Sequence, residues 1–372
     1  MSAPLVAIAA GGTGGHVFPG TALAEALTPR GYGVAFLTDR RGAEMAAFGE
    51  APTYVLPTAP LAGGLAIKAA GAVRLAAGVT RAALLLRRLK PAAVVGFGGY
   101  PSAPGLVAAT RLRRPTLIHE QNGVLGRANR LVAPRVSLIA TSLPDTEGVR
   151  PQDAHKVRLT GNPVRREVAA LAERPYPTRA ADQPLDVLVL GGSLGAHVLS
   201  QVVPAAVALL SPDRRERLRL TQQVRAEDLD AVRADYIHLN YKAELAPFFA
   251  DVPRRLASAH LVIGRAGAST VAELTAAGRP ALLVPYPHHA DQHQLLNARA
   301  LDRAGGAWLM PEESFTPEAL ASRLADLIDT PTTLEKAAAC ARAVGHPDAA
   351  ARLADLVDEL AGRNGGHREE AA

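Results

Sequence analysis

Short apolar runs alternate along the chain with segments whose apolar residues recur three and four positions apart. Residues 4–10 (PLVAIAA) and 32–39 (YGVAFLTD) have the length and composition of buried strands, and the segment between them has the helical pattern. This alternation predicts an α/β fold in which parallel strands are joined by right-handed crossover helices. Further strands are predicted within residues 91–105, 115–122, 185–195, 260–270 and 279–287.

Three of the predicted strands lead directly into glycine-rich turns. The turns lie in AIAAGGTGGHVFPG (residues 7–20), PAAVVGFGGYPSAPG (residues 91–105) and VLVLGGSLGAHVLS (residues 187–200). Backbone N–H groups in such turns approach a ligand closely, and the helix N-terminus behind them favours negative charge, so the turns suit a diphosphate. A tight connection without a ligand is the alternative. Pro19 and Pro104 are expected near the starts of the following helices.

The pattern restarts in the middle of the chain, which indicates two domains. After residues 159–168 a strand and a glycine turn follow again, and aligning Gly11 with Gly191 brings the two turns into register. The length of 372 residues also fits two domains of ordinary size. We expect two doubly wound, Rossmann-like domains at residues 1–162 and 163–345, a helix at 346–363 and a disordered tail at 364–372.

Composition and charge narrow the class of protein. Hydrophobic residues make up 48% of the chain and charged residues 20%, which is typical of a globular protein. The net charge of +6 favours an anionic partner, namely a nucleotide, a diphosphate lipid, a membrane surface or a nucleic acid. A nucleic acid has little support, because the basic residues are not interleaved with aromatic ones. The single cysteine, Cys340, predicts a reducing compartment, and we expect neither an export signal nor a membrane-spanning segment.

Two polar residues beside the glycine-rich turns are candidates for chemistry. His16 follows the first turn, where a helix N-terminus disfavours the protonated ring, so a neutral imidazole can accept a proton. Glu273 lies about one turn inside a helix that begins near Ser269 and Thr270, where a carboxylate can bind a ribose diol and N–H groups can bind phosphate. The alternatives are a capping or packing histidine and a glutamate that complements the helix dipole.

A nicotinamide-binding domain is a rival interpretation. It would use Asp39, at the end of the second strand, to bind a ribose. The G-x-G-x-x-G fingerprint is broken, however, by Val17 in the first turn and by Leu194 in the later one.

A metal site is a second rival, because HHADQHQLLNA at residues 288–298 contains three histidines. The segment has no H-E-x-x-H pattern, although His289 and His293 are four residues apart. We favour the recognition of sugar hydroxyls, by Asp291, His293 and Gln294.

Six motifs occur together in a fixed order between about residue 5 and residue 310. They are GGTGGHVFPG, GFGGYPSAPG, HEQNGVLGRANR, GNPVR, GGSLGAH and RAGASTVAELTAAGRPALLVPYPHHADQHQLLNA. The set resembles the MurG family of peptidoglycan glycosyltransferases, which move N-acetylglucosamine from UDP-N-acetylglucosamine to lipid I and so make lipid II. The resemblance implies a B-type glycosyltransferase fold with two domains facing a cleft: residues 1–162 for the acceptor and membrane, and residues 163–345 for the UDP-sugar. The helix at 346–363 then packs back on the first domain.

The functional positions of the family match residues of this chain. The resemblance implies UDP-N-acetylglucosamine as donor substrate, with no tightly bound cofactor and no metal. We hypothesise that His16 is the general base of one inverting displacement, with Glu120 as an orienting or alternative base. The donor-binding positions are Thr13, Gly14, Gly15, Asn122, Arg165, Ser193, Phe248, Phe249, Ala268, Ser269, Thr270, Glu273, His293 and Gln294. The acceptor-binding positions are His16, Tyr100, Ser102, Asn122 and Arg165.

Two positions depart from the family pattern. Leu194 stands where the family often has glutamine and Ala266 where serine is common, so each removes a polar side chain near the donor. The alternative function is another UDP-sugar enzyme of the same fold, either a lipid glycosyltransferase or an epimerase. Such an enzyme would share the donor motifs but lack GGYPSAPG together with HEQNG.

Residues 61–91 form the predicted contact with a membrane. The segment mixes Leu, Ala, Ile and Val with six basic residues and no acidic one, so apolar groups can rest at the lipid boundary while cations meet anionic headgroups. We therefore expect a peripheral protein at the cytoplasmic face of the cell membrane, in contact with lipid I, the anionic inner surface and other cell-wall synthesis proteins. The alternative is one or two core-packed helices with a solvated basic face.

Overall fold

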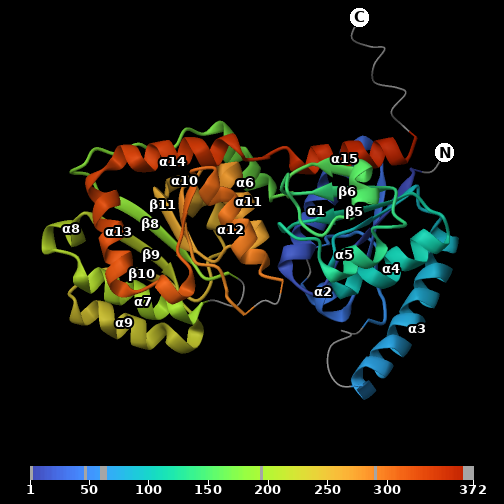
Figure 1. Ribbon diagram of the computed structural model, residues 1–372, viewed down its shortest axis with the longest axis horizontal. Helices are drawn as coiled ribbons and strands as arrows, with labels where there is room; N and C mark the ends of the chain where they lie inside the picture. Colours follow the sequence, from blue (N-terminus) through green and yellow to red (C-terminus); the bar gives the residue numbers. More distant parts are fainter. Residues whose placement is uncertain (1–2, 46–47, 59–64, 193–195, 289–290, 363–372) are drawn as a thin grey trace, which may run out of the picture. The chain divides into compact units, whose positions relative to one another are not determined.

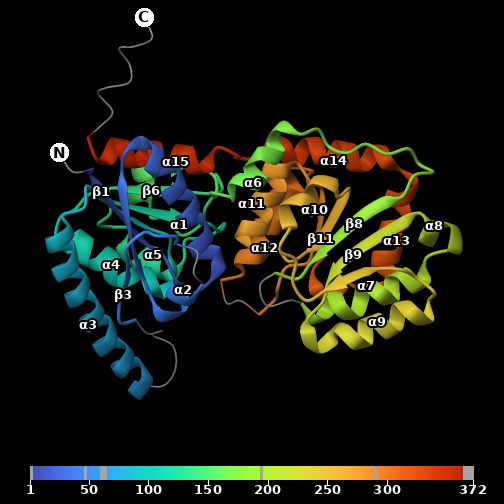
Figure 2. The same cartoon turned by 180° about the vertical axis from the view of Figure 1, so that it is seen from behind.

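The computed structural model describes residues 3–45, 48–58, 65–192, 196–288 and 291–362, and of residues 65–69 it describes the backbone alone. The chain divides into two compact units (Figures 1 and 2). Unit 1 consists of Met1–Arg165 with Asp348–Ala372, and unit 2 consists of Arg166–Pro347. The tail at 364–372, which we expect to be disordered, lies outside the described residues.

Unit 1 is built on a parallel sheet of seven strands in the order β3-β2-β1-β4-β5-β6-β7. In the centre, Ile8 of β1 pairs with Phe36 of β2 on one side and with Val95 of β4 on the other. The carboxyl ends of β1, β4 and β5 lead into the first two glycine turns and Glu120, at the edge where doubly wound sheets bind their ligands. The strands are β1 (Leu5–Ala9), β2 (Gly33–Thr38), β3 (Thr53–Val55), β4 (Ala93–Gly96), β5 (Thr116–Glu120), β6 (Leu138–Thr141) and β7 (Val157–Leu159).

Helices cover both faces of this sheet (Figure 1). Alternate residues of β1 point to opposite faces: Ile8 packs in one core with Leu23 of α1 and Leu353 of α15, whereas Ala9 packs in another with Leu86 of α3 and Ala109 of α4. The final helix of the chain is therefore part of the core of unit 1. The helices are α1 (Gly14–Leu27), α2 (Arg40–Glu44), α3 (Leu65–Leu89), α4 (Gly99–Arg111), α5 (Arg127–Val132) and α15 (Ala349–Leu360).

Unit 2 repeats this plan with six parallel strands in the order β10-β9-β8-β11-β12-β13. In both units the first strand lies third from one edge, which is the order of a doubly wound sheet. The predicted α/β class with two Rossmann-like units is therefore confirmed. The strands are β8 (Leu185–Leu190), β9 (Leu218–Gln223), β10 (Glu244–Ala246), β11 (Leu261–Gly264), β12 (Ala281–Leu283) and β13 (Ala307–Leu309). The helices are α6 (Arg166–Ala169), α7 (His197–Leu209), α8 (Pro212–Glu216), α9 (Leu229–His238), α10 (Val252–Ser258), α11 (Ala268–Ala277), α12 (His293–Arg303), α13 (Pro317–Asp329) and α14 (Pro331–Ala343).

The corresponding glycine turns of the two units share one backbone feature. Gly12 and Gly192 both have φ of 80°, in the left-handed region that glycine adopts without a Cβ clash. The prediction for the prolines was wrong, because Pro19 and Pro104 lie inside helices rather than in their first turns. The reason is that glycines form the first turn: α1 already begins at Gly14 and α4 at Gly99, which moves each proline into the second turn.

Candidate functional site

A chain of hydrogen bonds connects His16 to the core of unit 1. His16 Nδ1 lies 3.1 Å from Gln121 Oε1, and Gln121 Nε2 lies 3.1 Å from His119 Nδ1. His119 Nε2 in turn lies 2.9 Å from the carbonyl oxygen of Gly161. Gln121 Nε2 also donates to the carbonyl of Phe97, at 2.9 Å. The chain thus joins the first residues of α1 to the ends of β4 and β5.

The direction of these bonds determines which ring nitrogens carry hydrogen. The carbonyls of Gly161 and Phe97 only accept, so His119 Nε2 and Gln121 Nε2 must donate to them. His119 Nδ1 then accepts from Gln121, and Gln121 Oε1 accepts from His16 Nδ1–H. His16 is consequently the tautomer whose Nε2 bears a lone pair.

Burial keeps both imidazoles neutral at pH 7. Removal from water is the largest effect on His16 and holds its pKa below the ordinary value of 6.5, although the negative charge of Glu120 raises it. Burial also lowers the pKa of His119 to about 4, against the bond to Gly161, which raises it. A neutral His16 with an available Nε2 lone pair has the chemistry of a proton acceptor.

Glu120, the other predicted catalytic residue, is buried. Its carboxylate accepts hydrogen bonds from the loop that follows β5. Oε1 accepts from the backbone N–H of Asn122 at 3.1 Å and from the amide of the same residue at 3.2 Å. Oε2 accepts from the N–H of Gly126 at 2.8 Å and from the amide of Asn129 at 2.9 Å. Four hydrogen bonds hold the carboxylate against this loop, so the arrangement favours the orienting role over proton transfer.

The first glycine turn is held by Asp39, which follows β2. Asp39 Oδ1 accepts from the N–H groups of Gly12 at 3.0 Å and Gly42 at 2.9 Å. A Cβ atom at Gly11 would lie 2.7 Å from the same oxygen, so this close approach requires glycine. Asp39 therefore orders the turn, which differs from the ribose contact of a nicotinamide-binding domain. Three predicted donor-binding residues lie here. Thr13 is the N-cap of α1, and Gly14 and Gly15 begin its first turn.

The second glycine turn brings the predicted acceptor residues close to His16. A Cβ atom at Gly99 would lie 3.1 Å from His16 Nε2, so the two turns meet at the imidazole. Tyr100, next along α4, is 38% exposed. Ser102 is buried, and its hydroxyl donates to the Gly99 carbonyl at 2.9 Å. Arg165, also predicted for both substrates, is the last residue of the first stretch of unit 1 and is partly exposed.

In unit 2 the predicted phosphate-binding residues lie at the beginning of α11. The first turn of this helix contains Ala268, Ser269 and Thr270, whose N–H groups have no partner within the helix. Ser269 Oγ is buried, and among the described residues it has no hydrogen-bond partner. Glu273 is partly buried in the second turn. The structure thus brings these four residues together on one helix.

The departure at Ala266 leaves the local backbone in place. Ala266 is fully buried directly before the turn that leads into α11, and its carbonyl accepts from the Asn297 amide at 3.1 Å. This hydrogen bond uses the backbone of Ala266, so it does not require the serine hydroxyl that is common at this position in the family.

The predicted uracil and sugar contacts occupy two further places in unit 2. Phe248 is 74% exposed, whereas Phe249 is buried with the Arg255 guanidinium 4.1 Å from its ring centroid. Gln294, in the first turn of α12, accepts from the N–H of Tyr286 at 3.0 Å. His293, the other residue predicted to bind the sugar, is the first residue of α12.

Some predicted residues cannot be placed. Ser193, Leu194 and His289 lie outside the described residues. Among the residues that the structure describes, no group of three or more His, Cys, Asp or Glu side chains could hold a metal ion.

Sequence reasoning missed the two residues that orient His16. The motif HEQN was interpreted through Glu120 and Asn122, whereas Gln121 forms the hydrogen bond to the His16 imidazole and His119 in turn is hydrogen-bonded to Gln121. The period of a strand was the available signal, because residues 119 and 121 must share the face opposite Glu120.

Comparison with known proteins agrees with this architecture. Residues 6–141 match the glycosyltransferase family 28 N-terminal domain, and residues 186–353 match the glycosyltransferase family 28 C-terminal domain. The UDP-N-acetylglucosamine–N-acetylmuramyl-(pentapeptide) pyrophosphoryl-undecaprenol N-acetylglucosamine transferase of Rhodospirillum centenum is 54% identical over 370 residues, which cover 98% of this chain and 97% of that protein. The protein of the same name from Paramagnetospirillum magneticum is 52% identical over 356 residues, or 95% of this chain and 96% of that one.

A solved structure extends the similarity to three dimensions. The crystal structure of Acinetobacter baumannii MurG superposes with a TM-score of 0.79 at 31% identity and covers 96% of this chain and 99% of that one. The chain therefore belongs to glycosyltransferase family 28, within it to the MurG proteins, and has a B-type glycosyltransferase fold.

Proposed function

We propose that this chain is an inverting hexosyltransferase that moves N-acetylglucosamine from UDP-N-acetylglucosamine to lipid I. The product is lipid II, a precursor for peptidoglycan. The observation that carries this function is the 54% identity, over 98% of the chain, with a transferase whose name states this donor and this acceptor. The attacking group is the C4 hydroxyl of the N-acetylmuramoyl sugar.

In the proposed mechanism His16 Nε2 accepts the proton of that hydroxyl as the oxygen attacks the anomeric carbon. The bond to UDP breaks in the same displacement, so the configuration at the anomeric carbon inverts. The series of hydrogen bonds from Gly161 through His119 and Gln121 supports this role, because it keeps the hydrogen on His16 Nδ1 and the lone pair on His16 Nε2. A positioned base of this kind contributes about 10²-fold to 10⁴-fold in rate.

Glu120 is a positioning residue in this mechanism. Its four hydrogen bonds hold the loop from Asn122 to Asn129, and its charge raises the pKa of the nearby His16. The carboxylate therefore makes the imidazole a stronger base.

The donor is assigned to unit 2. We propose that the N–H groups at the beginning of α11 bind the diphosphate, that Glu273 binds the ribose and that Gln294 reads the sugar hydroxyls. The exposed Phe248 is the apolar partner for uracil, since Phe249 is used in the core. Arg165 and the helix N-terminus stabilise the charge that develops on the leaving UDP, and one such preorganised donor is worth about 3 kcal/mol. The acceptor is assigned to unit 1, beside His16 and Tyr100.

The function is tested by transfer of radiolabelled sugar from UDP-N-acetylglucosamine to a lipid I analogue, with other UDP-sugars as competitors. We expect a labelled product that requires the analogue and weak competition from UDP-glucose. Labelled N-acetylmannosamine formed without an acceptor would instead identify an epimerase, and transfer only to other lipids would identify a different glycosyltransferase. Either result would contradict the proposal.

The acceptor is a lipid, and α3 is our candidate for the membrane contact, at the cytoplasmic face of the cell membrane. This helix exposes Val73 and Leu84, at 70% and 61%, and it also exposes Arg74 and Arg88. Among the described residues, no helix is long and apolar enough to cross a membrane. The combination of exposed apolar and basic side chains on one helix suits anionic headgroups.

Flotation with anionic vesicles tests this contact. The double variant Arg74→Glu and Arg88→Glu is expected to bind vesicles at least about 30-fold more weakly, since each basic residue near an anionic surface is worth about 1 kcal/mol. The matched control, Lys242→Glu with Arg303→Glu, makes the same change of charge on exposed residues of unit 2 and is expected to bind as the unchanged chain does. Equal binding of both double variants would reject α3 as the membrane contact.

A further inference from the structure

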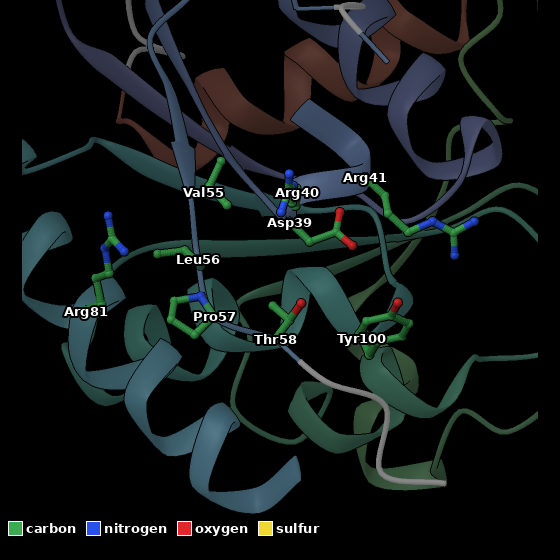
Figure 3. A pocket seen from close by; sticks show the side chains of 9 residues that line it. All are labelled: Asp39, Arg40, Arg41, Val55, Leu56, Pro57, Thr58, Arg81 and Tyr100. Carbon is green, nitrogen blue, oxygen red and sulfur yellow. The ribbon is translucent and has the colours of Figure 1, made fainter. Parts of the chain in front are cut away.

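A pocket of about 380 Å³ lies in unit 1 at the carboxyl edge of the sheet, and of its lining residues the proposed mechanism uses only Tyr100 (Figure 3). It is bounded by the ends of β2 and β3, by α2 and α3, and by Tyr100 at the start of α4. Asp39 links it to the first glycine turn through its bonds to Gly12 and Gly42. Its volume is in the range of sites that bind small molecules.

The side chains that line this pocket carry more positive than negative charge. Three arginines line it, and the one carboxylate that also does so, Asp39, already accepts two backbone N–H groups. Arg40 forms an ion pair with Glu44, at 3.1 Å. Arg41 and Arg81 form no ion pair with any residue that the structure describes. Two guanidinium groups are therefore available to an anion, and Arg binds carboxylates and phosphates in a bidentate manner.

The position of Arg81 is fixed by the close packing of α3 against the end of β3. Gly78, three residues earlier and thus on the same side of α3, lies directly against the strand end at Pro57. A Cβ atom at Gly78 would overlap the Pro57 carbonyl oxygen. Only glycine permits this approach, and it brings the middle of α3, and Arg81 with it, over the pocket.

The shape of the pocket distinguishes between the anions of the acceptor. Figure 3 shows Arg81 on one side and Arg41 with Tyr100 on the other, while Val55, Leu56 and Pro57 form a wall. A diphosphate is compact and is bound well by clustered N–H groups of glycine turns. Two separated guanidinium groups along an apolar wall suit a longer ligand whose carboxylates are separated by apolar groups.

We infer that this pocket binds carboxylates of the pentapeptide that the acceptor carries. The inference rests on the proposed function, because it deepens the description of the same acceptor. Both the peptide and the diphosphate are anionic, so the experiment must separate them. Arg41 and Arg81 are binding residues in this proposal and take no part in proton transfer.

The experiment measures KM for two water-soluble acceptor analogues with short prenyl chains, one with the pentapeptide and one without it. Vesicles are absent, so the role of α3 at a membrane does not contribute. The variants are Arg41→Met and Arg81→Met, and the control is Arg111→Met, an exposed arginine at the other end of α4. Thermal melting of each variant verifies that it is folded.

With the pentapeptide analogue, we expect KM for the acceptor to rise about tenfold in Arg41→Met and in Arg81→Met, as for the loss of one charge-assisted hydrogen bond. With the peptide-free analogue, both variants should match the unchanged chain, and Arg111→Met should match it with both analogues. Arg41→Lys should recover part of the loss, because it retains the charge. Free pentapeptide should inhibit the unchanged chain in competition with the acceptor, and the variants more weakly.

Two results would overturn the inference. One is an unchanged KM of both variants for the pentapeptide analogue. The other is an equal rise of KM for the peptide-free analogue, which would assign the pocket to the diphosphate. Failure of the proposed function would look different, since the unchanged chain would then transfer sugar to neither analogue.

Discussion

Acidification should destabilise unit 1 through His119, by an amount that follows from its environment. The ring is buried, and its pKa is about 4 in place of the ordinary 6.5. Between these pH values the unfolded chain binds a proton at His119 that the folded chain does not bind, so the free energy of unfolding falls as pH falls. A shift of about 2.5 pH units at 1.36 kcal/mol per unit corresponds to a loss of about 3 kcal/mol between pH 7 and pH 4.

The comparison that isolates this contribution is with His119→Gln, whose amide can still donate toward the Gly161 carbonyl. Hydrogen exchange in increasing urea, followed by mass spectrometry of peptides that cover β5, reports on unit 1 alone. His16 titrates in both chains, so the difference between their pH dependences belongs to position 119. We expect the unchanged chain to lose about 3 kcal/mol more than the variant between pH 7 and pH 4. Parallel curves would refute the assignment of a neutral, buried His119.

Two further substitutions test how the site is held. Gly78→Ala should lower the free energy of unfolding of unit 1 by about 1–2 kcal/mol in urea. The overlap with the Pro57 carbonyl outweighs the better helix propensity of alanine. Equal or higher stability of the variant would contradict this packing. Glu120→Gln should shift the acid limb of the pH–rate profile to lower pH, because it removes the charge that raises the pKa of His16. Loss of the acid limb would instead identify Glu120 as the base.

The sequence predicted the doubly wound sheets because strand and helix periods are local. Each glycine-rich turn follows a short apolar run, and the same pattern in two places indicated the repeated unit. The proline positions were predicted wrongly for a reason that is also local: glycine was read as turn only, whereas Gly14 and Gly99 each begin a helix. Composition alone cannot distinguish these uses of glycine.

The parts of the site that the sequence did not predict depend on contacts between distant residues. Asp39 was considered as a ribose contact, but its partners are Gly12 and Gly42, which only the paired strands bring to it. The role of Gln121 depends on Phe97 and His16, which come from other elements. Such bonds require the register of the sheet, so a motif can indicate that a residue matters without showing what it holds.

The most direct test of the account is single-turnover transfer to a lipid I analogue by the unchanged chain and by His16→Gln, from pH 5 to pH 8, with substrate binding measured in parallel. The rate constant of the unchanged chain should be level near pH 7 and fall as pH drops through the pKa of His16, below 6.5, because the protonated imidazole cannot act as a base. His16→Gln should be at least about 100-fold slower with unchanged substrate binding, and its rate should lack this acid limb. A loss of less than about tenfold, or the same acid limb in both chains, would contradict the assignment of His16 as the base.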